Sequence, residues 1–113
     1  MNEFNVVDLD NEIETINKTL CEVNRSIDDI YAIITVNREH KRSERLKNQI
    51  GSPKTKIVTS RHKIGHTGGT DILFNLNEIL RETANEKIEI VMSASGFGYT
   101  WCSLFVEIEK RRL

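Results

Sequence analysis

The stretch LDNEIETINKTLCEVNRSIDDIYAII, residues 9–34, carries the strongest pattern in the chain. Its large apolar residues recur at alternating steps of four and three, and they are Leu9, Ile13, Ile16, Leu20, Val23, Ile27, Ile30 and Ile34. Such a heptad seam is typical of a helix that packs against another helix, so it predicts one amphipathic helix over residues 9–34.

This seam suits two kinds of partner. It either closes over the rest of the domain or pairs copies of the chain in the manner of a coiled coil. In the second case the protein is a homo-oligomer, a dimer or larger, and the interface consists of Ile13, Ile16, Leu20, Val23, Ile27, Ile30 and Ile34.

The apolar stripe ends after Ile34, because the next two seam positions hold Asn37 and Lys41. Residues 38–50 form a second, strongly charged helical stretch that either continues the first helix or folds back on it. The sequence Gly-Ser-Pro at residues 51–53 then marks the clearest boundary in the chain.

The boundary divides one compact domain into a helical oligomerisation or packing segment, residues 1–50, and a β-α-β-β unit, residues 54–113. The elements predicted in the second unit are a strand at 56–64, a helix at 71–85 and a hairpin of strands at 87–93 and 99–109. The predicted fold class is α+β: an N-terminal amphipathic helix or helical hairpin followed by this unit, with a small, mainly antiparallel sheet. A unit of about 60 residues buries too small a core alone, so the N-terminal helix or a second copy must cover it.

The net charge of −1 hides a strong asymmetry along the chain. Residues 1–34 hold eight acids and two bases (−6), residues 35–66 nine bases and two acids (+7), and residues 67–113 five bases and seven acids (−2). The basic middle third is either an ordinary solvated surface or a site for an anion, or for the acidic first third of another copy.

The composition also bears on location. No apolar run is long enough to span a membrane, so we expect no membrane partner. The first residues lack the basic and apolar regions of a secretory signal, which favours a cytoplasmic setting. Cys21 and Cys102 have no CxxC partner and fall at apolar positions, so we expect buried free thiols rather than a disulfide.

Two features indicate a binding site. A basic run and a glycine-rich loop lead into the helix at 71–85, where main-chain N–H groups can hold an anion, and the candidate residues are Arg61, His62, Lys63, His66 and Thr67. One face of the last strand carries the aromatic residues Phe97, Tyr99 and Trp101. These aromatics either pack beneath the N-terminal helix or a second subunit, or they stack on a base.

The same residues give little support to catalysis. His62 and His66 lack a third metal ligand, and Cys102 falls on an aliphatic face where a thiolate is disfavoured. The acids of the first helix lie on solvent faces without an apolar pocket to change their protonation. We therefore predict no catalytic residues, no metal and no cofactor.

Taken together, these patterns favour a non-enzymatic, self-associating module that captures an anionic ligand carrying a base: a nucleotide, a cyclic nucleotide or a short nucleic acid. Arg61 and Lys63 would meet the phosphate, and Tyr99 or Trp101 would stack on the base. The alternative is a small phage-like or mobile-element-like inhibitor or adaptor that acts by binding a host protein.

Overall fold

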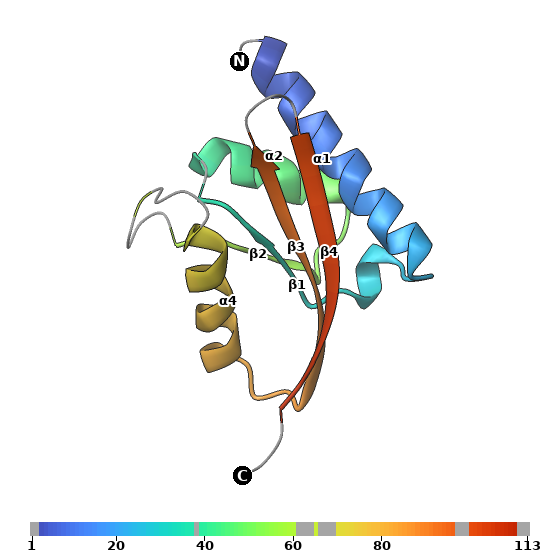
Figure 1. Ribbon diagram of the computed structural model, residues 1–113, viewed down its shortest axis with the longest axis vertical. Coiled ribbons are helices and arrows are strands. Elements are labelled where there is room, and N and C mark those ends of the chain that lie inside the picture. Colours follow the sequence, from blue (N-terminus) through green and yellow to red (C-terminus); the bar gives the residue numbers. More distant parts are fainter. Residues whose placement is uncertain (1–2, 38, 61–64, 66–69, 97–99, 111–113) are drawn as a thin grey trace.

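The computed structural model describes residues 3–37, 39–60, 65, 70–96 and 100–110. In chain order its elements are α1 (Glu3–Glu22), the short 3-10 helix η1 (Ile27–Asp29), β1 (Ala32–Thr35), α2 (His40–Ile50), β2 (Lys56–Val58), α4 (Thr70–Glu82), β3 (Lys87–Gly96) and β4 (Thr100–Glu109). Figure 1 shows these elements coloured along the sequence. The predicted α+β class, with an N-terminal helix ahead of a small sheet, is confirmed.

The sheet has four strands and is mixed, in the order β2-β1-β3-β4. β1 pairs parallel with both neighbours, so Ile33 lies opposite Ile57 on one side and Val91 on the other. β3 and β4 form the predicted antiparallel hairpin, which runs from the pair of Lys87 and Glu109 to the turn. Antiparallel pairing is confined to this hairpin because β1 runs parallel to both of its neighbours, so the sheet is mixed rather than mainly antiparallel.

The predicted helix over residues 9–34 is wrong in its second half, because α1 ends at Glu22. Asn24 takes a left-handed backbone conformation with a φ of 56°, which Asn tolerates better than most residues with a side chain. Ser26 then caps η1 in a capping box with Asp29. The turn at residues 23–26 therefore separates the first half of the seam from the second.

β1 is the part of the seam that the heptad pattern misassigned. All four of its residues, Ala32–Thr35, are buried. A short, mostly β-branched run buried on both faces is typical of a central parallel strand. Because side chains alternate along a strand, Ile33 packs in the core beneath α1 and α2, whereas Ile34 packs in the core beneath α4.

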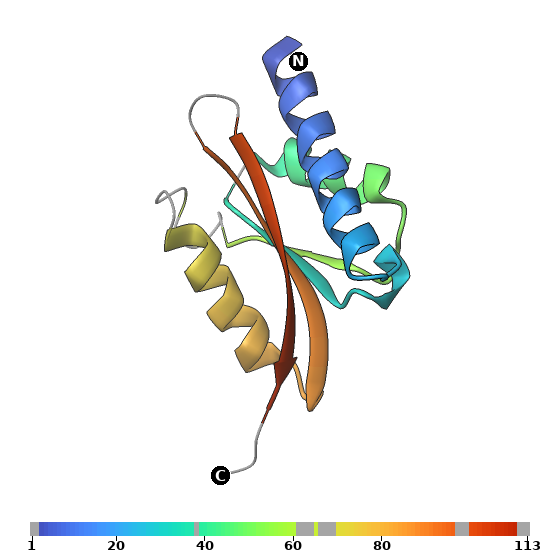
Figure 2. The same cartoon turned by 45° about the vertical axis from the view of Figure 1, so that its right-hand side comes forward.

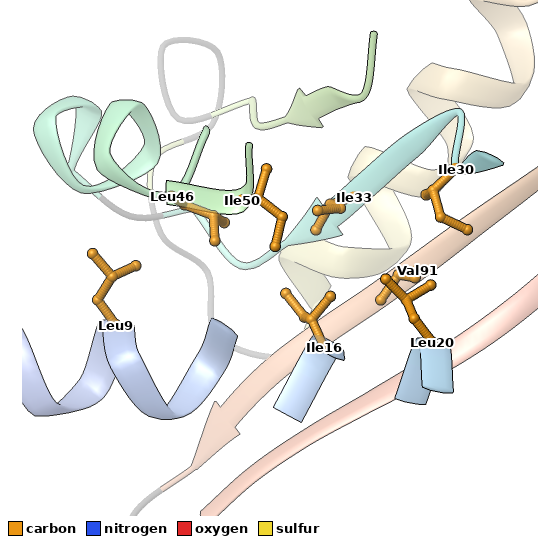
Figure 3. Close-up of a cluster of buried hydrophobic side chains, with 8 residues drawn as sticks. All are labelled: Leu9, Ile16, Leu20, Ile30, Ile33, Leu46, Ile50 and Val91. Carbon is orange, nitrogen blue, oxygen red and sulfur yellow. The ribbon is translucent and has the colours of Figure 1, made fainter. Parts of the chain in front are cut away.

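Helices cover both faces of the sheet, as Figure 2 shows. α1 and α2 lie on one face, with α1 packed over β4, and α4 lies on the other face against β1. Figure 3 shows the core between the sheet and the first two helices, which consists of Leu9, Ile16, Leu20, Ile30, Ile33, Leu46, Ile50 and Val91.

The seam thus closes over the sheet of its own chain. Four of the residues predicted to contact a second copy are buried within a single chain: Ile16, Leu20, Ile30 and Ile34. They are not available to a second copy, which corrects that part of the predicted interface. Contact between copies stays a prediction for the half-buried residues Ile13, Val23 and Ile27.

α2 neither continues α1 nor follows it directly as a hairpin, because β1 lies between the two helices. It ends at Ile50, and Gly51 follows with a φ of 78°, a conformation that glycine adopts without steric cost. The predicted boundary at residues 51–53 coincides with this end. The segment before the boundary nevertheless contributes a strand to the sheet.

The expectation of buried thiols is wrong, because Cys21 and Cys102 are both free and exposed. Cys21 lies on α1 next to the buried Leu20, on the side turned away from the core. Cys102 lies on the face of β4 opposite to α1, the side of the sheet that carries α4. Within the described ranges, no helix is both long and apolar enough to cross a membrane.

Candidate functional site

The carboxyl ends of the parallel strands β1 and β2 lie side by side, since Ile34 pairs with Val58. In open sheets of this kind, ligands bind beyond the carboxyl ends of the strands, where loops and helix starts converge. Here β1 leads into Asn37, β2 leads into Ser60, and both residues bond to the first turns of α4. The polar side chains at this edge form the candidate site.

Asn37 is the centre of this edge and is only 2% exposed. Its side-chain amide donates to the carbonyl of Gly65 at 2.6 Å and to the hydroxyl of Ser60 at 3.2 Å. Its side-chain oxygen accepts from the Ser60 N–H at 3.0 Å and from the hydroxyl of Thr59 at 3.1 Å. These bonds hold the chain on both sides of residues 61–64 against the end of β1.

Two fully buried residues of α4 complete the arrangement. Asn75 donates to the carbonyl of Thr35 at 2.8 Å and to Oδ1 of Asn37 at 3.0 Å, and its own oxygen accepts from the Ser60 hydroxyl. Asp71 accepts from the main-chain N–H of Asn37 at 3.0 Å. Asp71 stands in the first turn of α4, where the helix dipole favours a carboxylate.

We call these side chains the Asn37 network, and its members are Asn37, Thr59, Ser60, Asp71 and Asn75. A buried polar group without a partner is costly, whereas a paired network fixes one arrangement of the surrounding backbone. The network consists of amides and hydroxyls around a single carboxylate. Its chemistry therefore suits the positioning of a loop and the donation of hydrogen bonds more than proton transfer.

An open groove of about 360 Å³ runs beside β2 and reaches the network at Ser60 and Asn75. Sites for small ligands have volumes of this order. The rest of its wall combines apolar and charged side chains, among them Ile57, Val58, Ile79, Lys47, Lys56, Glu78 and Glu82. Across the described ranges, no three His, Cys, Asp or Glu side chains gather so that they could hold a metal ion.

Most of the residues predicted to bind a ligand lie outside the described residues: Arg61, His62, Lys63, His66, Thr67, Phe97 and Tyr99. Those numbered 61–67 belong to the segment that connects β2 with α4. The described neighbours of this segment, Ser60 and Gly65, are held by the Asn37 network.

Trp101, the remaining predicted residue, donates its indole N–H to Asp8 of α1 at 2.9 Å. Asp8 also accepts from Arg42 at 2.7 Å, and Arg42 donates to Glu12 at 2.9 Å. Glu12 in turn accepts from Ser93 at 2.8 Å. The indole is thus engaged beneath the N-terminal helix, in line with the packing interpretation rather than with stacking on a base.

We call these five residues the Arg42 cluster, and they join α1, α2, β3 and β4. Asp8 and Glu12 are 4% and 2% exposed, so the charges lie largely out of water, and the expectation that the acids of the first helix lie on solvent faces is wrong for these two. Burial by itself lowers the pKa of Arg42, but the nearby charges of Glu12 and Asp8 and their hydrogen bonds outweigh it and raise the pKa above its ordinary value. The cluster fixes α1 and α2 against the hairpin.

Comparison with known families identifies the unit that carries these features. The model of the C-terminal region of 3-oxoacyl-[acyl-carrier-protein (ACP)] synthase III matches residues 20–108, which is most of the chain and includes the whole Asn37 network. The chain belongs to this synthase III family. No curated protein sequence matches the chain.

Solved structures share the fold of this synthase III domain at low sequence identity. The 3-oxoacyl-(acyl carrier protein) synthase III of Pseudomonas aeruginosa PAO1 has a TM-score of 0.84 and 17% identity, over 95% of this chain and 34% of that one. The enzyme of Aquifex aeolicus VF5 has a TM-score of 0.76 and 20% identity, over 86% and 32%. A tetronic acid condensing enzyme has 0.75 and 14%, over 95% and 36%. The chain spans about a third of the length of these proteins.

Membership in the synthase III family corrects the functional expectations from sequence. The family is named for an enzyme, so the prediction of a non-enzymatic module that captures a nucleotide or nucleic acid is wrong. The alternative of a phage-like inhibitor or adaptor is overturned by the same match. The aromatic face and the basic strand on which the first prediction rested are common features that do not distinguish a base-binding sheet from a packed one.

Sequence reasoning missed all members of the Asn37 network. One signal was present, because Asn75 interrupts the apolar face of its helix between Ile72 and Ile79. A polar residue at a buried helical position needs a hydrogen-bond partner, and the polar residues at the ends of the neighbouring strands could supply it. For Asn37 itself there is no such signal, because a helix over residues 9–34 places no strand end next to this residue.

Proposed function

We propose that this chain supplies the C-terminal part of a condensing enzyme that builds a 3-oxoacyl product on an acyl carrier protein. The proposal is supported by the family match over residues 20–108 and by the names of the structures with the same fold, which describe synthases and a condensing enzyme. The observation that carries it is the buried Asn37 network at the carboxyl ends of β1 and β2.

The network's role is one of positioning. Joining two acyl units develops negative charge on carbonyl oxygens, and donors held in advance at the right place stabilise that charge. The amide and hydroxyl groups described at this edge bond to one another, so they act by fixing the backbone at Ser60 and Gly65. We include His66 and Thr67 in the proposed site because they follow Gly65 directly in the sequence.

The rest of the reaction site would come from outside this unit. The chain spans about a third of the synthases that it matches. Within the described part of the network there is neither a thiol nor an imidazole, so a covalent step on an acyl group needs groups from elsewhere. Acyl carrier protein as the partner, self-association through Ile13, Val23 and Ile27, and a cytoplasmic location are part of this proposal.

The test is formation of the 3-oxoacyl product. The protein is purified with the polypeptides that stay bound to it, supplied with acyl thioesters and acyl carrier protein, and the product is followed by mass spectrometry. We expect Asn37→Ala to lower kcat about tenfold or more at unchanged KM for the carrier, because a displaced loop spoils alignment. Asn77→Ala, an exposed change on α4, leaves the rate unaltered.

Assays are run at a temperature where both variants are fully folded, so that lost stability does not count as lost activity. Absence of product from the purified protein, or an Asn37→Ala rate equal to that of Asn77→Ala, contradicts the proposal.

A further inference from the structure

The β3–β4 hairpin extends past the end of the central strand. β1 pairs with β3 as far as Thr35, which lies opposite Ser93. β3 continues to Gly96, which pairs with Thr100 at the start of β4. Because β1 and β3 run parallel, this part of the hairpin stands on the same side as the carboxyl end of β1, as Figure 1 shows. We call it the hairpin end, and its described residues are 94–96 and 100–102.

The hairpin end bounds the region in which a ligand would bind. Ligands of open sheets lie beyond the carboxyl ends of parallel strands. Next to β1 this region has the connection from β2 to α4 on one side, which the Asn37 network holds at Ser60 and Gly65. On the other side stands the extension of β3, since β1 lies between β2 and β3 in the sheet. The proposed site thus has two walls, and the Asn37 network accounts for one of them.

The Arg42 cluster holds the second wall. Ser93, directly before the hairpin end in β3, donates to Glu12 at 2.8 Å, and Trp101 in β4 donates to Asp8 at 2.9 Å. Each strand of the hairpin is therefore bonded to a different acid of α1. Arg42 joins these two acids, because its guanidinium donates to Asp8 at 2.7 Å and to Glu12 at 2.9 Å.

The guanidinium of Arg42 fixes direction as well as distance. Its Nε and Nη2 atoms both donate to Oδ2 of Asp8, at 3.0 and 2.7 Å, while Nη1 donates to Oε1 of Glu12. Arginine donors form a rigid planar fork, so the two acids are held at a set separation. A lysine ammonium keeps the charge but offers no such fork. The Arg42 side chain is only 14% exposed, so little water competes for its donors.

Arg42 also follows Asn37 closely along the chain. It lies in the first turn of α2, five residues after Asn37, and its main-chain N–H donates to the carbonyl of Glu39 at 3.0 Å. Asn37 bonds to Asp71 of α4 on one face of the sheet, whereas Arg42 bonds to α1 on the other face. One short stretch of chain therefore carries the anchors of both walls.

We propose that Arg42 is a positioning residue for the condensation: through Asp8 and Glu12 it sets where the hairpin end stands relative to the Asn37 network. This inference rests on the proposed function and adds a second wall to its site. Reacting groups must be held close to their final geometry, and a displacement of about 1 Å can lower a rate about a hundredfold. An Arg42 cluster that only stabilised the fold would leave every folded molecule fully active.

Amide hydrogen exchange tests the positioning without an assay of activity. Arg42→Lys removes the fork, and Trp101→Phe is a milder change that removes one bond between α1 and the hairpin end. Arg25→Lys is the matched control, because Arg25 bonds to both carboxylate oxygens of Glu89 near the start of β3, away from the hairpin end. We expect amides of the hairpin end to exchange about tenfold or more faster in the first two variants and at the natural rate in the control.

Kinetics of the condensation then separate positioning from stability. The protein is purified with the polypeptides that stay bound to it and assayed with acyl thioesters and acyl carrier protein, at a temperature where every variant is fully folded. We expect kcat to fall about tenfold or more in Arg42→Lys at unchanged KM for the carrier, because the hairpin end is displaced while the carrier still docks. Arg25→Lys keeps the natural kcat and KM. Trp101→Phe, which leaves Arg42 bonded to both acids, falls between the two.

The other outcomes overturn the proposal. Unchanged exchange of the hairpin end in Arg42→Lys and Trp101→Phe means that Arg42 does not position it, whatever the activity. Faster exchange with a natural kcat means that the Arg42 cluster is structural alone, and equal effects of Arg42→Lys and Arg25→Lys mean that the effect is not specific to the hairpin end. If the natural protein forms product in these cases, the inference about Arg42 fails by itself. If the natural protein forms none, the proposed function fails, and the role of Arg42 in the reaction fails with it.

Discussion

The side-chain amide of Asn75 donates a hydrogen bond of 2.8 Å to the main-chain carbonyl of Thr35 and so joins α4 directly to the end of β1. Both residues are buried, at 0% and 2% exposure. The same amide group also bonds to Asn37, so one side chain of α4 fixes the direction in which the chain leaves β1.

Removal of this side chain should destabilise the protein. Asn75→Ala removes the buried donor to the carbonyl of Thr35 and the acceptor of the Ser60 hydroxyl, so we expect the free energy of unfolding to fall by about 1–3 kcal/mol. Urea denaturation measures the loss. The control is Asn77→Ala on the exposed side of the same helix, for which the change stays within about 0.5 kcal/mol. Equal losses would show that the network contributes no stability.

The Arg42 cluster should be sensitive to loss of its only cation. Arg42→Met leaves Asp8 and Glu12 buried without a counter-charge, and breaking a buried pair in this way costs about 3–5 kcal/mol. Urea denaturation of the variant and of the natural protein measures the loss. Lys18→Met, which breaks an exposed pair with Glu14, should cost within about 1 kcal/mol. A loss for Arg42→Met no larger than that for Lys18→Met would refute this account.

Tyr31 should titrate below the ordinary range of a tyrosine. A hydrogen bond with Thr83, and then one with Lys56, lower its pKa. The pKa of Tyr31 in the folded protein lies below the value of about 10 in the unfolded chain. The ionised phenol therefore adds stability above the unfolded pKa, and this stability is lost as the pH falls through the folded pKa. In a Tyr99→Phe background, phenolate absorbance should rise at a lower pH than in the unfolded chain. Adding Thr83→Val should move the transition upward, and an unmoved transition would contradict the assigned cause.

The assignment of residues 32–35 to a strand predicts which of two substitutions, Ile33→Ala or Val23→Ala, destabilises the protein more. Ile33→Ala opens a cavity between the sheet and the first two helices, so we expect a loss of about 2–5 kcal/mol. Val23→Ala, at a half-buried seam position after α1 ends, should cost clearly less. A continuous heptad helix would reverse this order, because Val23 is a seam residue in that arrangement and Ile33 is not. Thermal or urea unfolding of the two variants decides between them.

Local patterns sufficed wherever an element packs through one face. The predicted helix at 71–85 is observed as Thr70–Glu82, and the predicted hairpin is formed by Lys87–Gly96 and Thr100–Glu109. In the helix the apolar residues repeat with the helical period, because one side meets the core and the other meets water. The hairpin strands pack through both faces, and the small residues between them indicated the turn instead. The predicted stop near Pro53 also coincided with the end of a helix.

The central strand escaped prediction for a physical reason. β1 is buried on both faces, so its sequence shows no alternation of apolar and polar residues. The spacings from Ile27 to Ile30 and from Ile30 to Ile34 also happen to continue the heptad pattern of α1. The Asn37 network was not predicted because its arrangement depends on β1. Its members follow β1, follow β2 or lie on α4, and only the parallel pairing of β1 with β2 brings them together. If residues 32–35 are assigned to a helix, there is no parallel pair of strands whose carboxyl ends could bring these residues together.

The central place of β1 also sets the order in which the molecule can be assembled during synthesis. β1 finds its neighbours at residues 56–58 and 90–93, so its second partner is synthesised well after its first. Non-local parallel pairing of this kind is slow, and contacts that close long loops come late. Until β3 and β4 have been made, the apolar side of the first helix lacks the sheet that covers it, and this is the period in which a chaperone would recognise it.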